Sequence, residues 1–262
     1  MSSDDQGPTT KGQRPRALLR LDADFLDQRG KALHFTAEGF SYDSESEVET
    51  AQRFSNSDDY FLPGKLGQQL AYLQAHPQVG AVFGLPAFIN EQGQVFDDPA
   101  HRDHNAFVAG ERTRHQWLRH FFDEGNALCH PTVLIRREVY DLLGLYDPRL
   151  AQVPDLDMWI RLASHTGLHV MPQALTAFRV RDGLQNASAG RPEVIVRDAW
   201  ERARILRHYL AMPAAELLQV FPEFAAQTEP LHEQLARYAL TKPSPFFHRF
   251  ALDAWFDSLP GG

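Results

Sequence analysis

The sequence predicts an α/β fold, with a mixed sheet flanked by helices and a helical C-terminal tail. Between residues 58 and 180, segments with a helical period alternate with short segments that have the period of strands, as in α/β proteins. After residue 191, helical segments separated by prolines replace this alternation. The composition, 43% hydrophobic and 23% charged over 262 residues, is that of an ordinary globular protein.

The first regular helix is predicted to begin near Pro63, because proline suits the first helical position. Leu66, Leu70 and Leu73 follow at i, i+4 and i+7 and form one apolar stripe. Pro77 is predicted to end the helix.

Short apolar runs next to glycine predict the strands that follow. Residues 79–83 are predicted to form a buried strand, and residues 87–90 and 94–96 a hairpin that turns at Gly93. The helical period predicts helices at 111–123 and 136–143 and a third helix with Asp155 as its N-cap. Short apolar runs predict strands at 132–135, 168–171 and 175–180.

The chain is predicted to have three parts. Residues 1–16 are polar without periodicity and are predicted to form a disordered leader, residues 17–190 the main domain, and residues 191–262 a helical extension. The weak apolar runs at 17–21 and 33–36 are predicted to be strands.

Charge and cysteine usage exclude several classes of function. The formal net charge of -8 argues against a nucleic-acid partner, which requires a positive surface. Cys129 is the single cysteine, so no intramolecular disulfide can form. No window approaches the roughly 18 apolar residues of a membrane span, and no signal peptide is visible. A cytoplasmic protein is therefore expected.

Four segments of the chain carry recognisable motifs. They are Asn56-Ser57-Asp58-Asp59-Tyr60-Phe61-Leu62-Pro63-Gly64-Lys65-Leu66, Gln78 to Gly84 with Phe88 to Gly93, Gly125 to Arg136, and Pro154 to Leu162. Taken in order, they resemble a family-two glycosyltransferase of the GT-A fold. The first is similar to the aspartate motif of that family and the helix after it, and the second to the segments that follow in many members. The third resembles the loop and strand on the acceptor side, and the last resembles the helix with the catalytic carboxylate.

This resemblance, which covers about half of the chain, implies that a nucleotide sugar gives up its sugar to a hydroxyl of a carbohydrate or lipid-linked acceptor. Departure of a nucleoside diphosphate develops negative charge, which a divalent cation such as Mg or Mn, or arginine side chains, can stabilise. The acceptor hydroxyl needs a base on the opposite side of the anomeric carbon, and inversion follows if a carboxylate is that base.

Asp155 is the residue that the resemblance assigns as catalytic base. Its alternative role is purely local, because aspartate is common at helix N-caps. Asp157 and Arg161 stand at i and i+4, which favours an ion pair on the helix surface, and Trp159 is predicted to lie in the core.

Asp58 and Asp59 are the predicted metal ligands, since Mg and Mn prefer hard oxygen donors. Their alternative role is to cap the helix that begins near Pro63. Asn56 stands where the family has its first aspartate, and an uncharged amide is a poorer ligand. Residues 21–25, Leu-Asp-Ala-Asp-Phe, resemble a second aspartate motif but lie too far from the strand at residue 79 to share its register.

The resemblance implies four further site residues. Asn126 and His130 lie on the loop that the family uses near the acceptor, and the alternative for His130 is a hydrogen-bonded surface residue. Arg179 and Arg181 end the last strand, where they would neutralise the diphosphate, or would simply be solvated.

The donor-binding half expected of this family is short here. Only 55 residues precede Asn56, whereas each βαβ unit needs roughly 30 residues or more. Two hypotheses follow: an active glycosyltransferase, or an inactive glycosyltransferase-like module that binds a carbohydrate or a protein. An incomplete sheet would leave an open edge, and we expect residues 17–36 or a second subunit of a homo-oligomer to cover it.

Overall fold

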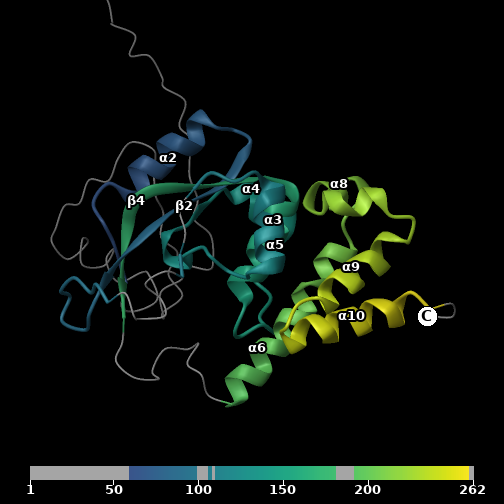
Figure 1. Ribbon diagram of the computed structural model, residues 1–262. Coiled ribbons are helices and arrows are strands. Elements are labelled where there is room, and N and C mark those ends of the chain that lie inside the picture. Colours follow the sequence, from purple (N-terminus) through teal and green to yellow (C-terminus); the bar gives the residue numbers. More distant parts are fainter. Residues whose placement is uncertain (1–58, 99–105, 108–109, 181–191, 260–262) are drawn as a thin grey trace, which may run out of the picture.

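The computed structural model describes residues 59–98, 106–107, 110–180 and 192–259. This part of the chain contains a four-stranded sheet in the order β1-β4-β2-β3, with long central strands (Figure 1). β2 and β4 run parallel, and the two short strands pair antiparallel at the edges. The strands are β1 (Tyr60–Phe61), β2 (Val79–Ile89), β3 (Leu134–Ile135) and β4 (Gly167–Arg179). The predicted mixed sheet flanked by helices is thus confirmed, while residues 1–58 lie outside the described part.

The central strands are longer than the sequence predicts. β2 joins the predicted strand at 79–83 to the first arm of the hairpin, and β4 joins the two strands predicted at 168–171 and 175–180. The register between β2 and β4 shifts near Leu85, so each interruption of the pattern is absorbed as an irregularity in a continuous strand. The hairpin itself is reduced to a bridge between Ile89 and Val95.

Helices cover both faces of the sheet. α2 (Lys65–Ala75) lies on one face, where Leu73 packs with Val82. α3 (Arg114–Asp123) and α5 (Pro154–His165) lie on the other face, where the ring of Phe83 meets that of Trp159 edge to face. The short α4 (Arg137–Leu143) follows β3, and η1 (His130–Thr132) precedes β3. The strand predicted at 132–135 is therefore shorter than expected, because Thr132 belongs to η1.

The prediction that Asp155 caps α5 is wrong. α5 begins one residue earlier, with Pro154 at its first position and Val153 as N-cap, and no side chain caps it. Proline is well suited to this position because its missing N–H would have no partner inside the helix. Asp155 therefore lies inside the first turn, which leaves its carboxylate available for other contacts.

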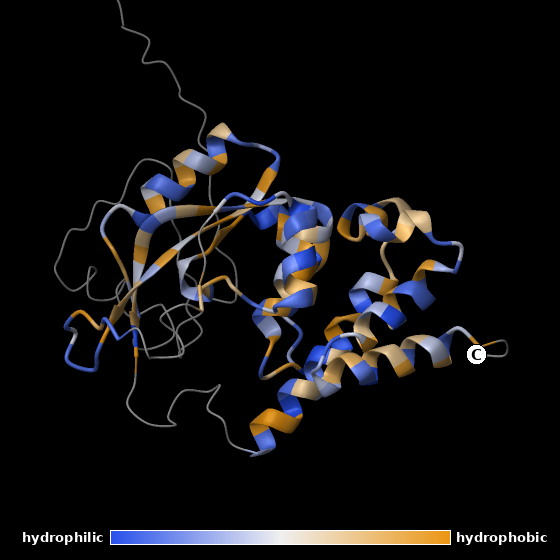
Figure 2. Cartoon of the chain, viewed as in Figure 1, coloured by the Kyte–Doolittle hydropathy of each residue, from blue (hydrophilic) through white to orange (hydrophobic). Residues whose placement is uncertain are grey.

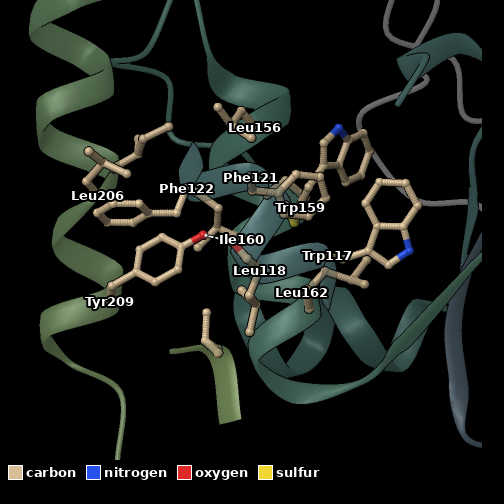
Figure 3. Close-up of a cluster of buried hydrophobic side chains, with 14 of the residues drawn as sticks. Trp117, Leu118, Phe121, Phe122, Leu156, Trp159, Ile160, Leu162, Leu206 and Tyr209 are labelled. Atoms are coloured by element: carbon tan, nitrogen blue, oxygen red, sulfur yellow. Dashed lines mark hydrogen bonds between the residues drawn. The ribbon is translucent and has the colours of Figure 1, made fainter. Parts of the chain in front are cut away.

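Beyond α3 and α5, the tail forms a layer of helices (Figure 1). Hydrophobic and hydrophilic residues mix around each of them (Figure 2). Their apolar sides join the same core as α3 and α5, and there Tyr209 donates a hydrogen bond to the carbonyl of Leu118 (Figure 3). The elements are α6 (Pro192–Ile205), α7 (Arg207–Leu210), α8 (Ala214–Val220), η2 (Pro222–Ala226), α9 (Leu231–Leu240) and α10 (Pro245–Asp257).

None of the described helices combines the length and the apolar character that crossing a bilayer requires.

Two glycines allow a matched test of this packing. A Cβ on Gly84 of β2 would lie 2.5 Å from Cδ1 of Leu175 in β4, whereas a Cβ on Gly67 of α2 would meet nothing within 4 Å. We expect Gly84→Ala to lower the free energy of unfolding by about 1–3 kcal/mol through overpacking. Gly67→Ala should raise it by about 0.5–1 kcal/mol through helix propensity. Urea denaturation measures both, and equal effects of the two substitutions would contradict the register of β2 on β4.

Candidate functional site

The site is centred on Asp155, a half-buried side chain in the first turn of α5. The amide of Asn126 donates a hydrogen bond of 2.7 Å to its Oδ2, and the backbone N–H of Leu156 donates one of 2.8 Å to its Oδ1. Asn126 is itself oriented, because its Oδ1 accepts from the backbone N–H of Leu128 at 2.9 Å. The structure thus brings together two residues that are 29 positions apart and that the resemblance assigns to one site.

Gly125 makes this arrangement possible at the end of α3. Its φ of 90° lies in the left-handed region, which glycine adopts without strain. A Cβ at this position would also lie 2.8 Å from Nη1 of Arg202 in α6. The glycine therefore turns the chain sharply from α3 to Asn126 and leaves space for an arginine of the tail.

His130 lies on the same side of the domain. Its Nε2 and the hydroxyl of Tyr146 are 3.0 Å apart, and its ring centroid is 5.8 Å from that of Trp159. Burial raises the pKa of Asp155 above its ordinary value, and the positive charges of His130 and Arg202 offset part of that rise. A carboxylate with a raised pKa binds a proton more readily near neutral pH, as a general base requires.

Asp59 belongs to the same electrostatic environment through Cys129. Burial raises the pKa of the Cys129 thiol well above its ordinary value, and the carboxylates of Asp59 and Asp155 raise it further. Asp59 is buried, and its Oδ1 accepts a hydrogen bond of 2.8 Å from the backbone N–H of Arg179.

The alternative role of Asp59 as a helix cap is wrong. Gly64 is the N-cap of α2, and no side chain bonds to that helix end. Asp58 lies outside the described residues. Within the described ranges, no group of three or more His, Cys, Asp or Glu side chains is arranged to hold a metal ion. The assignment of Asp58 and Asp59 as metal ligands therefore stays a prediction.

Lys65 is a buried cation beside the site that the sequence analysis missed. Its Nζ donates to Oε1 of Gln69 at 2.9 Å and to the carbonyl of Val133 at 3.3 Å, and lies over the ring of Phe61. Burial lowers its pKa to about 7. The buried side of α2 consists of Lys65, Gln69 and Leu73, which are spaced at i, i+4 and i+8. This spacing in line with Leu73 is the signal in the sequence that could have predicted the burial of the two polar residues.

Of the two arginines predicted to meet the diphosphate, only Arg179 lies in the part of the chain that the structure describes. Nη1 of Arg179 donates to the carbonyls of Asn90 and Glu91, at 2.6 and 2.8 Å, and so holds the turn that follows β2. Arg181 lies outside the described residues.

Two sequence predictions about α5 are confirmed. Asp157 and Arg161 form an ion pair of 2.8 Å, and Trp159 is fully buried. The predicted place of the pair on the helix surface is wrong, because Asp157 is buried. Asp157 also accepts from Nε2 of His208 in α7 at 2.7 Å, which the sequence did not indicate.

A comparison with known proteins finds a distant relative that is described as a glycosyltransferase. The chain is similar to a protein of Methanocaldococcus jannaschii that is described as an uncharacterized glycosyltransferase. The two are 22% identical over 126 residues, which is 48% of this chain and 40% of the relative. The chain thus spans well under half of that relative's length. No protein-family profile matches the chain.

The raised pKa of Asp59 predicts a pH-dependent stability difference. Burial raises the pKa from 3.8 to about 6, so the fold favours the protonated form, and that stabilisation is lost as the pH rises through about 6. Asp59→Asn cannot ionise and keeps an oxygen for the N–H of Arg179. We expect this variant to be more stable than the wild type at pH 8 by about 1–3 kcal/mol, and equally stable near pH 4.

Urea denaturation between pH 4 and pH 8 measures this difference. Asp141→Asn, on the exposed surface of α4, is the matched control and should change the free energy of unfolding by less than about 0.5 kcal/mol. A variant at position 59 that is less stable than the wild type at pH 8 would contradict the conclusion that burial outweighs the stabilisation of this carboxylate by Arg179.

Proposed function

We propose that this protein is a glycosyltransferase that moves a sugar from a nucleotide sugar to an acceptor hydroxyl, with inversion and with Asp155 as the base. The observation that carries the proposal is the carboxylate of Asp155, which Asn126 orients and burial makes more basic. The similarity to a protein described as a glycosyltransferase and the order of the four sequence segments support it.

In this reaction one oxygen of Asp155 accepts the proton of the acceptor hydroxyl while that hydroxyl attacks the anomeric carbon. The bond from the anomeric carbon to the phosphate oxygen breaks on the opposite face, and its electron pair leaves with the nucleoside diphosphate. Asn126 holds the carboxylate through Oδ2, and Leu156 holds it through Oδ1. This pairing fixes the direction of the lone pair that takes the proton.

Two sets of residues would meet the diphosphate. Asp58 and Asp59 would hold a divalent cation, Mg or Mn, which would supply positive charge to the departing oxygens. Arg179, the last residue of β4, and Arg181, two positions further along the sequence, would supply guanidinium donors to the same oxygens. The backbone bond from Arg179 to Asp59 ties these two sets together.

The second candidate function is an inactive module that binds a carbohydrate without transferring it. It is favoured by Asn56, which puts an uncharged amide where the family has its first aspartate.

Ligand-dependent melting separates the two functions. We expect UDP, GDP or dTDP to raise the Tm, and Mn²⁺ to increase that rise, because a ligand that binds only the folded state stabilises it. Asp59→Asn should remove the part that depends on Mn²⁺. If none of the three diphosphates raises the Tm with or without Mn²⁺, while simple oligosaccharides do, the donor-binding proposal fails and the binding module is supported.

A further inference from the structure

Glu201 of α6 makes an unusual set of contacts with the segment that leads into α5. Its side chain is fully buried, and its carboxylate accepts hydrogen bonds from three successive backbone amides. The N–H of Ala151 lies 2.9 Å from Oε1, and those of Gln152 and Val153 lie 2.6 and 3.1 Å from Oε2. Val153 is the N-cap of α5, so this set of bonds ends two residues before Asp155.

The charge on Glu201 is well compensated. Burial by itself would raise its pKa, but the backbone amides and the guanidinium of Arg197 outweigh burial and hold the pKa below the ordinary value. Nε of Arg197 donates to Oε1 at 2.6 Å, and its Nη2 donates to the carbonyl of Arg149 at 3.0 Å. The segment before α5 has no helix or strand of its own, so these bonds to α6 determine its path.

The residue next to Glu201 contacts the other half of the site. The guanidinium of Arg202 lies against Gly125, at the position where a Cβ would be only 2.8 Å away, and its positive charge acts on Asp155. Two adjacent residues of α6 therefore contact both segments that build the site, the one before Asn126 and the one before Asp155.

We propose that Glu201 is a positioning residue for Asp155, and that the tail helix α6 is thereby part of the catalytic unit. Glu201 does not touch the reacting atoms. It fixes the three amides before α5, and so fixes the first turn in which the carboxylate of Asp155 meets Asn126. Its catalytic consequence rests on the proposed function of Asp155 as a base.

The direct test is Glu201→Gln, which keeps the size of the side chain. Its NH₂ group cannot accept a hydrogen bond, so at least one backbone amide of the segment loses its partner. We expect the pKa of Asp155, followed by carbon-13 NMR of its carboxyl group and assigned with Asp155→Asn, to fall by about one unit as the freed segment admits water. Release of nucleoside diphosphate from UDP-glucose, GDP-mannose or dTDP-glucose, with water or an added oligosaccharide as the acceptor of the sugar, should slow by about 10-fold or more in kcat, with KM within about twofold.

Two further variants separate positioning from other effects. Glu201→Asp keeps the charge but is too short to reach all three amides, so it should behave like Glu201→Gln if positioning is the cause, and like the wild type if charge alone is the cause. Arg197→Gln removes the ion pair that supports Glu201 and the hydrogen bond to the carbonyl of Arg149, but leaves the Glu201 carboxylate in place. It should give the same changes in a weaker form even if the variants at position 201 fold poorly.

Glu216→Gln is the matched control in the tail. Glu216 of α8 pairs with Arg114 and His115 of α3, away from the segment before α5. This variant should lower the Tm without changing the pKa of Asp155 or the kcat.

The results have distinct meanings. One result overturns the inference: Glu201→Gln lowers the Tm as Glu216→Gln does, but leaves the pKa of Asp155 unchanged and the kcat within twofold of the wild type. Glu201 would then be only structural. If the wild type releases no nucleoside diphosphate from any of the three donors, the proposed function fails, while the NMR measurement still decides whether Glu201 positions Asp155.

Discussion

Replacing Asp155 by asparagine is expected to slow sugar transfer by ~10²–10⁴-fold, the usual contribution of a general base. Asparagine has nearly the same shape, and its oxygen can still accept from the backbone N–H of Leu156. It cannot take the proton of the acceptor hydroxyl at neutral pH. We therefore expect the loss in kcat, measured as release of nucleoside diphosphate, with little change in KM. The Tm should fall slightly, because the NH₂ group of the new side chain cannot accept the hydrogen bond from Asn126.

The pH profile gives the same prediction a second readout. The reaction needs the ionised carboxylate, and burial raises the pKa of Asp155. Activity of the wild type should therefore fall on the acid side at a higher pH than an ordinary aspartate would give. The residual activity of Asp155→Asn should lack this acid limb.

Asp157→Asn provides the contrast from the same helix. Asp157 is paired with Arg161 and His208, so its replacement should lower the Tm and leave kcat within about threefold. Equal losses of activity in the variants at positions 155 and 157 would show that α5 as a whole, and not one carboxylate, had been disturbed.

The largest expected effect on stability comes from Phe122→Ala. Phe122 is almost fully buried at the end of α3, where it faces the tail (Figure 3). Its ring centroid lies 5.0 Å from that of Tyr209, 5.2 Å from that of Phe221 and 5.6 Å from that of Phe247. Truncation leaves a cavity between α3 and three tail segments, and we expect the free energy of unfolding to fall by about 3–5 kcal/mol.

Urea denaturation at one pH measures this loss. Phe256→Ala is the matched control, because Phe256 of α10 is 72% exposed. Its replacement should change the free energy of unfolding by less than about 0.5 kcal/mol. A small effect at position 122 would mean that the tail does not contribute to the same core as α3.

The helices around the sheet could be predicted from local pattern. The stripe with Leu73 and the proline before it predicted α2, and the helical period at 136–143 predicted α4. The pair of Asp157 and Arg161 also follows from spacing within one helix. These features depend on residues three or four positions apart, which the sequence displays directly.

The continuous central strands could not be predicted in the same way. Gly84 and its neighbours break the apolar pattern of β2, yet the backbone ladder to β4 continues past them with shifted register. Hydrogen bonds between strands do not depend on the side chains at those positions, so a local pattern underestimates strand length.

By itself, the sequence determined the α/β class, most helices, and which residues are candidates for the site, above all Asp155. Only the tertiary structure decided that Asn126 orients Asp155, that Lys65 is buried beside the site, and that Glu201 holds the segment before α5. The physical reason is that these groups find their partners 29 to 68 positions away. A buried polar group must be hydrogen-bonded, but nothing in its local sequence says which distant backbone will supply the partner.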